Sequence, residues 1–221
     1  MRSWQTTLLG VEEPRVDCAA TVERVDLDRG SWVDVGRAWL RGADTLLDTL
    51  VTTVPWRQGR RHMYGRMVDD PRLSRWYQPS DELPHPALAL MRTTLSSRYD
   101  VTFGVVGLNY YRDGRDGVAA HRDRELRHVD DTLVAIVTLG AARPFRLRPR
   151  DGGASLDIHP GSGDVLVMGG RTQADWEHAV PKVRSAGPRV SISLRWAARP
   201  AAPVTDALAT RRRSRSRLPS R

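Results

Sequence analysis

Residues 132–168 read TLVAIVTLGAARPFRLRPRDGGASLDIHPGSGDVLVM, and this stretch decides the fold. Short runs of strand-forming residues alternate here with Asp-Gly, Gly-Gly and Pro-Gly pairs that favour tight turns. No helical segment separates the runs, which argues against the strand–helix alternation of a parallel sheet. The pattern predicts a β-sandwich or jelly roll. With similar runs on both sides, the expected strands are 101–111, 132–139, 144–149, 154–159, 164–168, 176–180 and 188–196.

Two helices are expected before this strand-rich region. Apolar residues recur at helical spacing over residues 37–51, which predicts an amphipathic helix. Pro86 is well placed to begin a second helix, with Leu88, Met91 and Leu95 on its apolar face. We therefore expect an α+β fold in which N-terminal helices pack on one sheet of the jelly roll.

The composition is that of a folded protein. Of its 221 residues, 40% are hydrophobic and 28% are charged, which argues against disorder along the whole chain. No apolar run approaches the roughly 18 residues that a membrane span needs, and no signal peptide opens the chain. The single cysteine, Cys18, excludes a disulfide framework and a cysteine-rich zinc site. We expect a cytoplasmic monomer that does not contact membranes.

We expect one domain over residues 1–198, followed by a basic tail over residues 199–221. The net charge is +9, and the tail holds seven arginines against a single acidic residue, Asp206. Because such a segment cannot bury apolar surface, we expect it to be disordered. It could bind phosphates without sequence preference, or it could have no role.

A metal-binding pattern lies between the expected strands. His121-Arg122-Asp123 is an H-x-D triplet, and at the end of a strand its first and third side chains would point to the same side. His178 lies in the expected strand 176–180. Two histidines and one carboxylate form the facial triad that suits non-haem Fe(II). The alternative is a solvated turn with an unrelated half-buried histidine, because H-x-D arises easily by chance.

The last expected strand carries a charged face. In RVSISLR, Arg189, Ser191, Ser193 and Arg195 share one side of the strand. If that side is buried, the two arginines need an anionic partner, and a small dicarboxylate would satisfy them. The alternative is that this face is exposed to solvent.

Together, these features resemble the AlkB family of Fe(II)/2-oxoglutarate dioxygenases. The resemblance covers residues 60–196 and follows the family's order of motifs, although Ser191 and Ser193 stand where Asn and Thr are commoner. The matching segments are NYYRDG at 109–114, HRDRE at 121–125, GDVLVMGGRTQADWEHAVPK at 163–182 and RVSISLR at 189–195.

The resemblance implies a double-stranded β-helix with its core at about residues 101–196 and a nucleotide-recognition lid at about residues 56–84. It implies Fe(II) as the metal, with 2-oxoglutarate and O2 as cosubstrates. The implied metal ligands, which are also the catalytic residues, are His121, Asp123 and His178. The implied 2-oxoglutarate-binding residues are Asn109, Tyr111, Arg189, Ser191 and Arg195.

The implied activity is oxidative demethylation of N-alkylated bases in DNA, of the 1-methyladenine and 3-methylcytosine type. It would be coupled to decarboxylation of 2-oxoglutarate to succinate and to release of formaldehyde. The residues expected to bind the substrate are Met63, Tyr64, Arg66 and Glu125. Glu125 could instead pair with Arg122 or Arg124, and the lid segment could be an ordinary arginine-rich surface loop.

Two other functions remain open from the sequence. One is the same Fe(II)/2-oxoglutarate chemistry on RNA, protein or a small molecule. The other is a non-catalytic jelly-roll module that binds nucleic acid through its basic surface.

Overall fold

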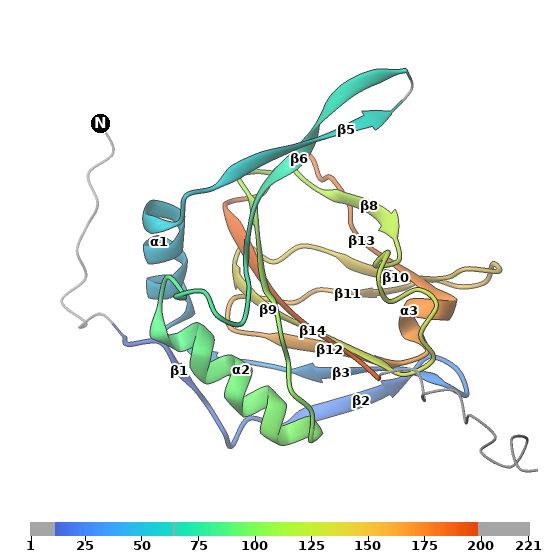
Figure 1. Cartoon of the computed structure of the whole chain (residues 1–221), viewed down its shortest axis with the longest axis horizontal. Helices are drawn as coiled ribbons and strands as arrows, with labels where there is room; N and C mark the ends of the chain where they lie inside the picture. The colour runs from blue at the N-terminus through green and yellow to red at the C-terminus, as the bar shows by residue number, and fades with distance from the viewer. Residues whose placement is uncertain (1–11, 64, 199–221) are drawn as a thin grey trace, which may run out of the picture.

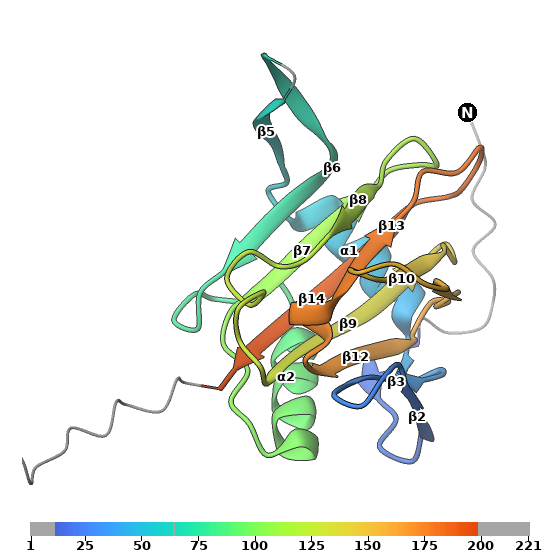
Figure 2. The ribbon, with the colours of Figure 1, turned by 90° about the vertical axis from the view of Figure 1, so that its right-hand side faces the viewer.

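Two antiparallel sheets stack face to face, and two helices cover the outer face of the larger sheet (Figure 1, Figure 2). This computed structural model describes residues 12–63 and 65–198, so the expected tail at 199–221 lies outside the described residues. The arrangement is a double-stranded β-helix, and it confirms the expected fold class.

The larger sheet has eight strands in the order β2-β3-β12-β9-β14-β7-β6-β5. In chain order these are β2 (Val22–Asp26), β3 (Ser31–Gly36), β5 (Arg57–Met63), β6 (Arg66–Tyr77), β7 (Val106–Tyr111), β9 (Thr132–Gly140), β12 (Val165–Gly170) and β14 (Arg189–Ala197). The smaller sheet has four strands in the order β11-β10-β13-β8. These are β8 (Val118–His121), β10 (Phe145–Pro149), β11 (Leu156–Ile158) and β13 (Trp176–Val180).

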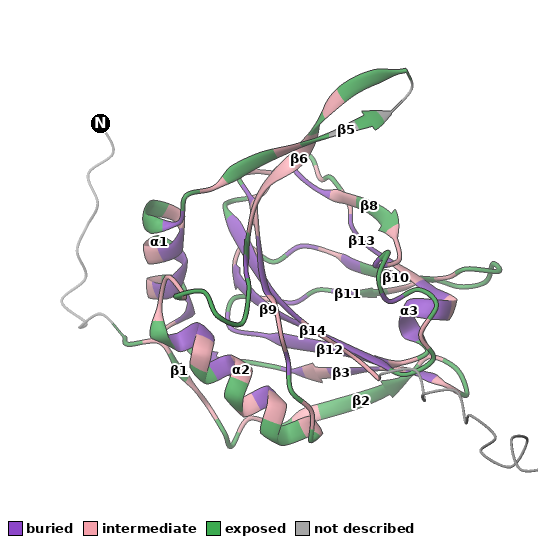
Figure 3. Cartoon of the chain, in the orientation of Figure 1, coloured by how far each residue is buried: buried purple, intermediate pink, exposed green. Residues whose placement is uncertain are grey.

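The long apolar run of β9 explains the layering. Because β9 lies inside the larger sheet, it is buried on both faces. Leu133 and Val137 pack with the helices, whereas Val134 and Ile136 face the smaller sheet. Figure 3 shows this contrast between the buried central strands and the β5–β6 hairpin, whose described residues are exposed or half-buried except Tyr77.

The first helix begins later than the sequence predicts. Helix α1 spans Ala43–Thr53, not 37–51. Gly42, which precedes it, has a φ of +64°, and a Cβ there would lie 2.5 Å from the carbonyl oxygen of Glu12. Leu40 pairs with Val16 in a short ladder of β1 (Arg15–Val16) and β4 (Leu40–Arg41). The apolar spacing therefore crosses a strand and a turn before the helix starts.

The second helix follows its prediction. Helix α2 spans Pro86–Tyr99, and Leu88, Met91 and Leu95 are buried against the larger sheet. The ring Nδ1 of His85 caps it by accepting a hydrogen bond from the backbone N–H of Ala87 at 3.1 Å. None of the described helices is long and apolar enough to cross a membrane.

The segment expected to form a lid contains a hairpin. Residues 57–63 and 66–77 form β5 and β6, which the charge-rich sequence did not indicate as strands. The hairpin is the last element at one edge of the larger sheet and projects away from the body (Figure 1, Figure 2).

Candidate metal and cosubstrate site

Two paired strands of the smaller sheet bring the expected metal ligands together. His121 is the last residue of β8 and lies opposite His178 of β13 in the ladder. The centroids of the two rings are 4.3 Å apart. Asp123 follows two residues after the strand end, and one ligand atom from each of the three residues lies within 4.8 Å of the others. The strand end predicted for H-x-D is thus present.

His178 is buried and neutral. Its side chain is 6% exposed, and its Nδ1 has no hydrogen-bond partner among the described residues. Burial, and after it the neighbouring His121, lower the pKa of His178 to about 3. The neutral ring therefore keeps one nitrogen lone pair free throughout the neutral pH range, as a metal ligand requires.

Asp123 is a buried carboxylate that stays ionised. Burial alone would raise its pKa, but the hydrogen bond from His121 and the positive charge of Arg195 outweigh burial and lower it. The Nε atom of Arg195 lies 3.0 Å from Asp123 Oδ2. The backbone N–H of Asp123 donates to Gln173 Oε1 at 2.9 Å. Gln173 belongs to α3 (Thr172–Asp175), a short helix that the sequence did not predict.

Two neutral imidazoles and one carboxylate are the donor set of non-haem Fe(II) sites. The Nδ1 atom of His121 lies 2.9 Å from the carbonyl oxygen of Ala119, within hydrogen-bond distance. Its Nε2 atom faces Asp123, at 3.6 Å from Oδ1. The residues present therefore fit the metal that the sequence implied.

Arg189 is a buried cation without an acidic partner. Its side chain is 0% exposed and donates to Thr138 Oγ1 at 3.0 Å and to Ser191 Oγ at 3.3 Å. Its Nη1 has no partner, and no carboxylate pairs with it within residues 12–63 and 65–198. Burial lowers the pKa of Arg189 to about 10, so the guanidinium remains charged at neutral pH. A buried charge held only by hydroxyls calls for an anionic ligand.

The expected 2-oxoglutarate residues meet on adjacent strands. In the β7–β14 ladder, Tyr111 lies opposite Arg189 and Asn109 lies opposite Ser191. Asn109, Tyr111, Ser191 and Arg195 line one cavity together with His121, Asp123 and His178. The face of β14 that carries Arg189, Ser191 and Ser193 is buried, which excludes the alternative that this face is exposed to solvent.

The expected substrate residues that the structure describes, Arg66 and Glu125, do not line this cavity. Arg66, the first residue of β6, is exposed, while Tyr64 and the side chain of Met63 lie outside the described residues. Glu125 is exposed, with Oε2 3.8 Å from Arg195 Nη1. Arg122 instead donates to the carbonyl oxygen of Ala174 at 2.7 Å, so it is not the partner of Glu125.

Two cavity residues on β6 were not among the expected site residues. The Trp76 ring is 40% exposed and lies under the guanidinium of Arg195, 4.8 Å from ring centroid to Cζ. Arg72 donates from Nε to Asn109 Oδ1 at 2.9 Å, and its Nη1 is buried with no partner in the described part of the chain. Both line the cavity. The alternation in PRLSRWY, residues 71–77, was the signal that could have placed them on one strand face.

Comparison with known proteins gives a consistent result. The model of the 2OG-Fe(II) oxygenase superfamily matches residues 41–212. Alpha-ketoglutarate-dependent dioxygenase alkB homolog 3 of Mus musculus is 32% identical over 180 residues, which cover 71% of this chain and 62% of that protein. The Homo sapiens counterpart is 32% identical over 198 residues, covering 79% and 66%. DNA oxidative demethylase ALKBH2 of Bos taurus is 31% identical over 122 residues, covering 50% and 43%.

The chain spans less than two thirds of the length of these relatives, at 62% and 66% for the two alkB homolog 3 proteins. A solved prolyl hydroxylase of Trichoplax adhaerens, in complex with a peptide fragment of hypoxia inducible factor, shares the fold with a TM-score of 0.58. It is 15% identical and covers 75% of this chain and 83% of its own, so it supports the fold alone.

Proposed function

The chain belongs to the AlkB family within the 2OG-Fe(II) oxygenase superfamily, and on this premise we propose that it oxidatively demethylates N-alkylated bases in DNA. The substrates are of the 1-methyladenine and 3-methylcytosine type. The observation that carries the proposal is a single cavity lined by the cluster of His121, Asp123 and His178. The buried guanidinium of Arg189, which has no acidic partner among the described residues, lies on the same face of β14 as the cavity residues Ser191 and Arg195. The name of one relative, DNA oxidative demethylase, supports DNA as the substrate class.

In this proposal Fe(II) is held by His121, Asp123 and His178. When bound, Fe(II) couples reduction of O2 by 2-oxoglutarate to hydroxylation of an N-methyl group, and the products are succinate, CO2, formaldehyde and the unmethylated base. Asp123 supplies the one negative charge of the ligand set. Gln173 keeps the backbone of that residue in place through the bond to its N–H.

The cosubstrate is oriented by the arginines of β14. Arg189, with Thr138 and Ser191, binds the distal carboxylate, since its free Nη1 lacks any other partner in the described residues. Arg195 lies beside Asp123 and binds the keto-acid end, assisted by Asn109. Because Arg189 and Arg195 are already held by neighbouring side chains before the ligand arrives, they need little reorganisation to bind it.

Trp76 supplies the surface on which a base can stack. A base must leave its duplex to reach a cavity of this kind, and it then needs an aromatic partner. The Trp76 ring lines the cavity and is partly exposed, as a stacking platform must be. Glu125, next to Arg195, is placed to make a polar contact with a cationic methylated base.

We also propose a monomeric, cytoplasmic enzyme. The exposed free thiol of Cys18 suits a reducing compartment. The large apolar side chains exposed on the described residues are scattered over β2, the hairpin and α2, which does not form one contiguous docking patch. They are Val25, Met67, Trp76 and Leu90.

The proposed function is tested by product release from methylated oligonucleotides. With Fe(II), ascorbate and 2-oxoglutarate present, we expect formaldehyde and succinate in equal amounts from DNA that contains 1-methyladenine or 3-methylcytosine. The unmethylated oligonucleotide of the same sequence is the control and should release no formaldehyde. Succinate without formaldehyde from DNA would reject the DNA substrate, and methylated RNA in a parallel assay would show whether RNA replaces it.

The stacking role of Trp76 predicts a selective defect. Trp76→Ala is expected to raise the KM for the methylated oligonucleotide by about tenfold or more, because base–aromatic stacking contributes about 1–3 kcal/mol. Trp76→Phe keeps an aromatic face and should retain most of the affinity. Equal KM values for the alanine variant and the wild type, measured by formaldehyde release, would remove Trp76 from the substrate site.

A further inference from the structure

The β5–β6 hairpin leaves the sheet before it reaches its tip. Strand β6 pairs with β7 only from Leu73 to Tyr77. Beyond Leu73, the described strands of the hairpin pair only with each other. Figure 2 shows the free part projecting from the body above β7 and β8. Its angle to the rest of the sheet must therefore be set by contacts at its root, where Arg72 and Trp76 line the cavity.

The root of the hairpin is built to bend. The β5–β6 register shifts between Gln58 and Arg60. A Cβ at the intervening Gly59 would lie 2.4 Å from Asp70 Oδ2, so the side chain of Asp70 lies against the glycine there. Pro71 stands in β6 at the same level and offers no N–H to a ladder. Such irregularities locally bend and twist a strand pair.

A rigid loop lies beside this root. The loop joins β7 to β8 over residues 112–117. Arg112 donates from Nε and Nη2 to the two carboxylate oxygens of Asp116, at 2.7 and 2.8 Å. Asp116 is 4% exposed. Burial acts to raise the pKa of Asp116, but the hydrogen bonds from Arg112 outweigh it and hold this pKa below its usual value.

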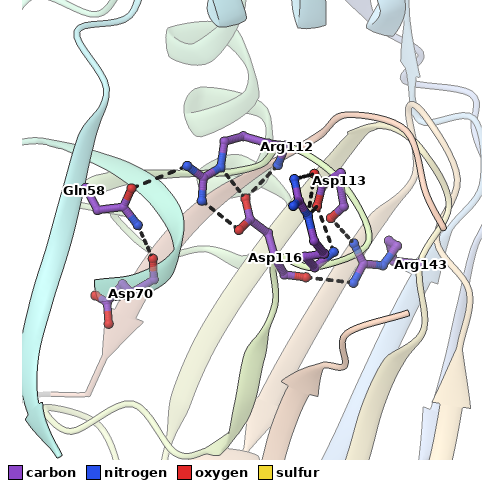
Figure 4. Close-up of polar contacts among 7 residues, drawn as sticks. Gln58, Asp70, Arg112, Asp113, Asp116 and Arg143 are labelled. Carbon is purple, nitrogen blue, oxygen red and sulfur yellow. Dashed lines mark hydrogen bonds and ion pairs between the residues drawn. The ribbon is translucent and has the colours of Figure 1, made fainter. Parts of the chain in front are cut away.

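Arg143 fixes the same loop from the inside (Figure 4). Its guanidinium is 1% exposed and donates to the carbonyl oxygens of Asp113 at 3.2 Å and of Asp116 at 3.0 Å. It also donates to the carbonyl oxygen of Pro181, just after β13, at 2.6 Å. The loop is thus attached to the strand that carries His178.

The loop contacts both strands of the hairpin at the bend. Arg112 Nη1 donates to Gln58 Oε1 at 3.4 Å, and Gln58 Nε2 donates in turn to the carbonyl oxygen of Asp70 (Figure 4). The backbone N–H of Gly117 donates to the carbonyl oxygen of Pro71 at 2.7 Å. A path of hydrogen bonds therefore runs from the loop to β5 and from there to β6.

The same loop connects two residues of the candidate site. Arg112 directly follows Tyr111, which lines the cavity, and Gly117 directly precedes β8, which ends at His121. One short segment is therefore bonded to the root of the hairpin while it joins the strands on either side of the cavity.

We propose that Arg112 and Gln58 are positioning residues that set the angle of the hairpin over the cavity and thereby control how the oligonucleotide binds. The inference rests on the proposed function, because it assigns the hairpin to the nucleic-acid side of the site. Neither residue is among the described residues that line the cavity, and their side chains bond instead to each other, to Asp116 and to the backbone of Asp70. The short Arg112–Asp116 ion pair holds Arg112 in place. The longer Arg112–Gln58 hydrogen bond is weaker, so it is the contact that breaks when the hairpin changes its angle.

The test removes the hairpin side of this contact and leaves the anchor intact. Gln58→Ala is expected to raise the KM for a methylated oligonucleotide by about fivefold, the usual effect of losing one or two hydrogen bonds. Succinate formation without oligonucleotide should keep the wild-type kcat and KM for 2-oxoglutarate. Gln78→Ala is the matched control, because Gln78 is also exposed but lies after the hairpin, and it should behave as wild type.

Hydrogen–deuterium exchange gives a readout that does not depend on the substrate. In Gln58→Ala, amides of residues 60–63 and 66–70 should exchange about fivefold faster, whereas those of β9 and β14 should not change. Unchanged exchange in the hairpin would overturn the inference. Faster exchange with an unchanged oligonucleotide KM would also overturn it, because the hairpin angle would then not affect binding.

A second variant separates positioning from folding. Arg112→Lys keeps a cation beside Asp116 but lacks the second arm that reaches Gln58. The double variant Gln58→Ala/Arg112→Lys should be no more defective than the worse single variant, since both changes remove the same contact. Additive effects would reject a shared contact. If wild-type protein releases no formaldehyde from any methylated oligonucleotide, the proposed function fails, while the exchange experiment still decides whether the contact holds the hairpin.

Discussion

His178→Ala is expected to abolish the iron-dependent conversion of 2-oxoglutarate to succinate. His178 supplies one of the three donors of the proposed metal site, and His121 is the one other histidine in that cluster among the described residues. Burial keeps its ring neutral, with a pKa of about 3, so the wild-type ring is ready to bind metal at neutral pH. Succinate release with Fe(II), ascorbate and 2-oxoglutarate measures the loss.

The loss must be separated from unfolding. Removing a buried ring that stacks near Phe145 costs about 2–4 kcal/mol of stability, so the circular dichroism spectrum and the melting temperature are measured alongside. His178→Asn, which keeps a polar side chain, is the second variant. His159→Ala is the matched control, because His159 is exposed and outside the cavity. Wild-type succinate release by a folded His178→Ala protein would reject the metal assignment.

Arg189→Met is expected to raise the KM for 2-oxoglutarate by about a hundredfold or more. Removing the cation takes away the buried partner of a carboxylate, a loss of about 3–5 kcal/mol. The same change should raise the melting temperature of the protein without ligand. In that state the guanidinium is buried with only hydroxyl partners, and methionine fills a similar volume without the charge.

Arg143→Met is the matched control for this prediction. Arg143 is as deeply buried as Arg189, at 1% against 0% exposed, but it donates to three backbone carbonyls. Its loss leaves buried acceptors unpaired and should lower the melting temperature. In thermal unfolding with a redox-inert divalent metal, 2-oxoglutarate should stabilise the wild type and leave Arg189→Met unchanged. A normal 2-oxoglutarate shift in Arg189→Met would reject Arg189 as the carboxylate partner.

The strands from residue 132 onward and the chemical motifs could be predicted because both are local signals. An apolar run bounded by turn residues predicted 132–139, and the structure has β9 at Thr132–Gly140. Alternation placed Arg189 and Arg195 on one face of a strand at 188–196, and β14 spans Arg189–Ala197. The family resemblance added the pairing of these motifs, which spacing alone could not provide.

Other features were hidden because they depend on distant parts of the chain. The start of α1 is decided by the left-handed backbone of Gly42 against Glu12, which apolar spacing does not reveal. Strands β5 and β6 are rich in charge and pair mainly with each other, so they lack the apolar alternation of a half-buried strand. Trp76 and Arg72 became cavity residues only once β6 was paired with β7.

By itself, therefore, the sequence determined the strands from residue 132 onward, the candidate ligands and the charged face of β14, because periodicity and motif order are properties of neighbouring residues. Tertiary structure alone decided that this face points inward, that Arg189 has no acidic partner in the described chain, and that Gln58 meets Arg112 across 54 residues. Burial and long-range contacts arise only when the sheets stack. They bring the candidate ligands into one cavity and leave the guanidinium of Arg189 buried without an acidic partner among the described residues.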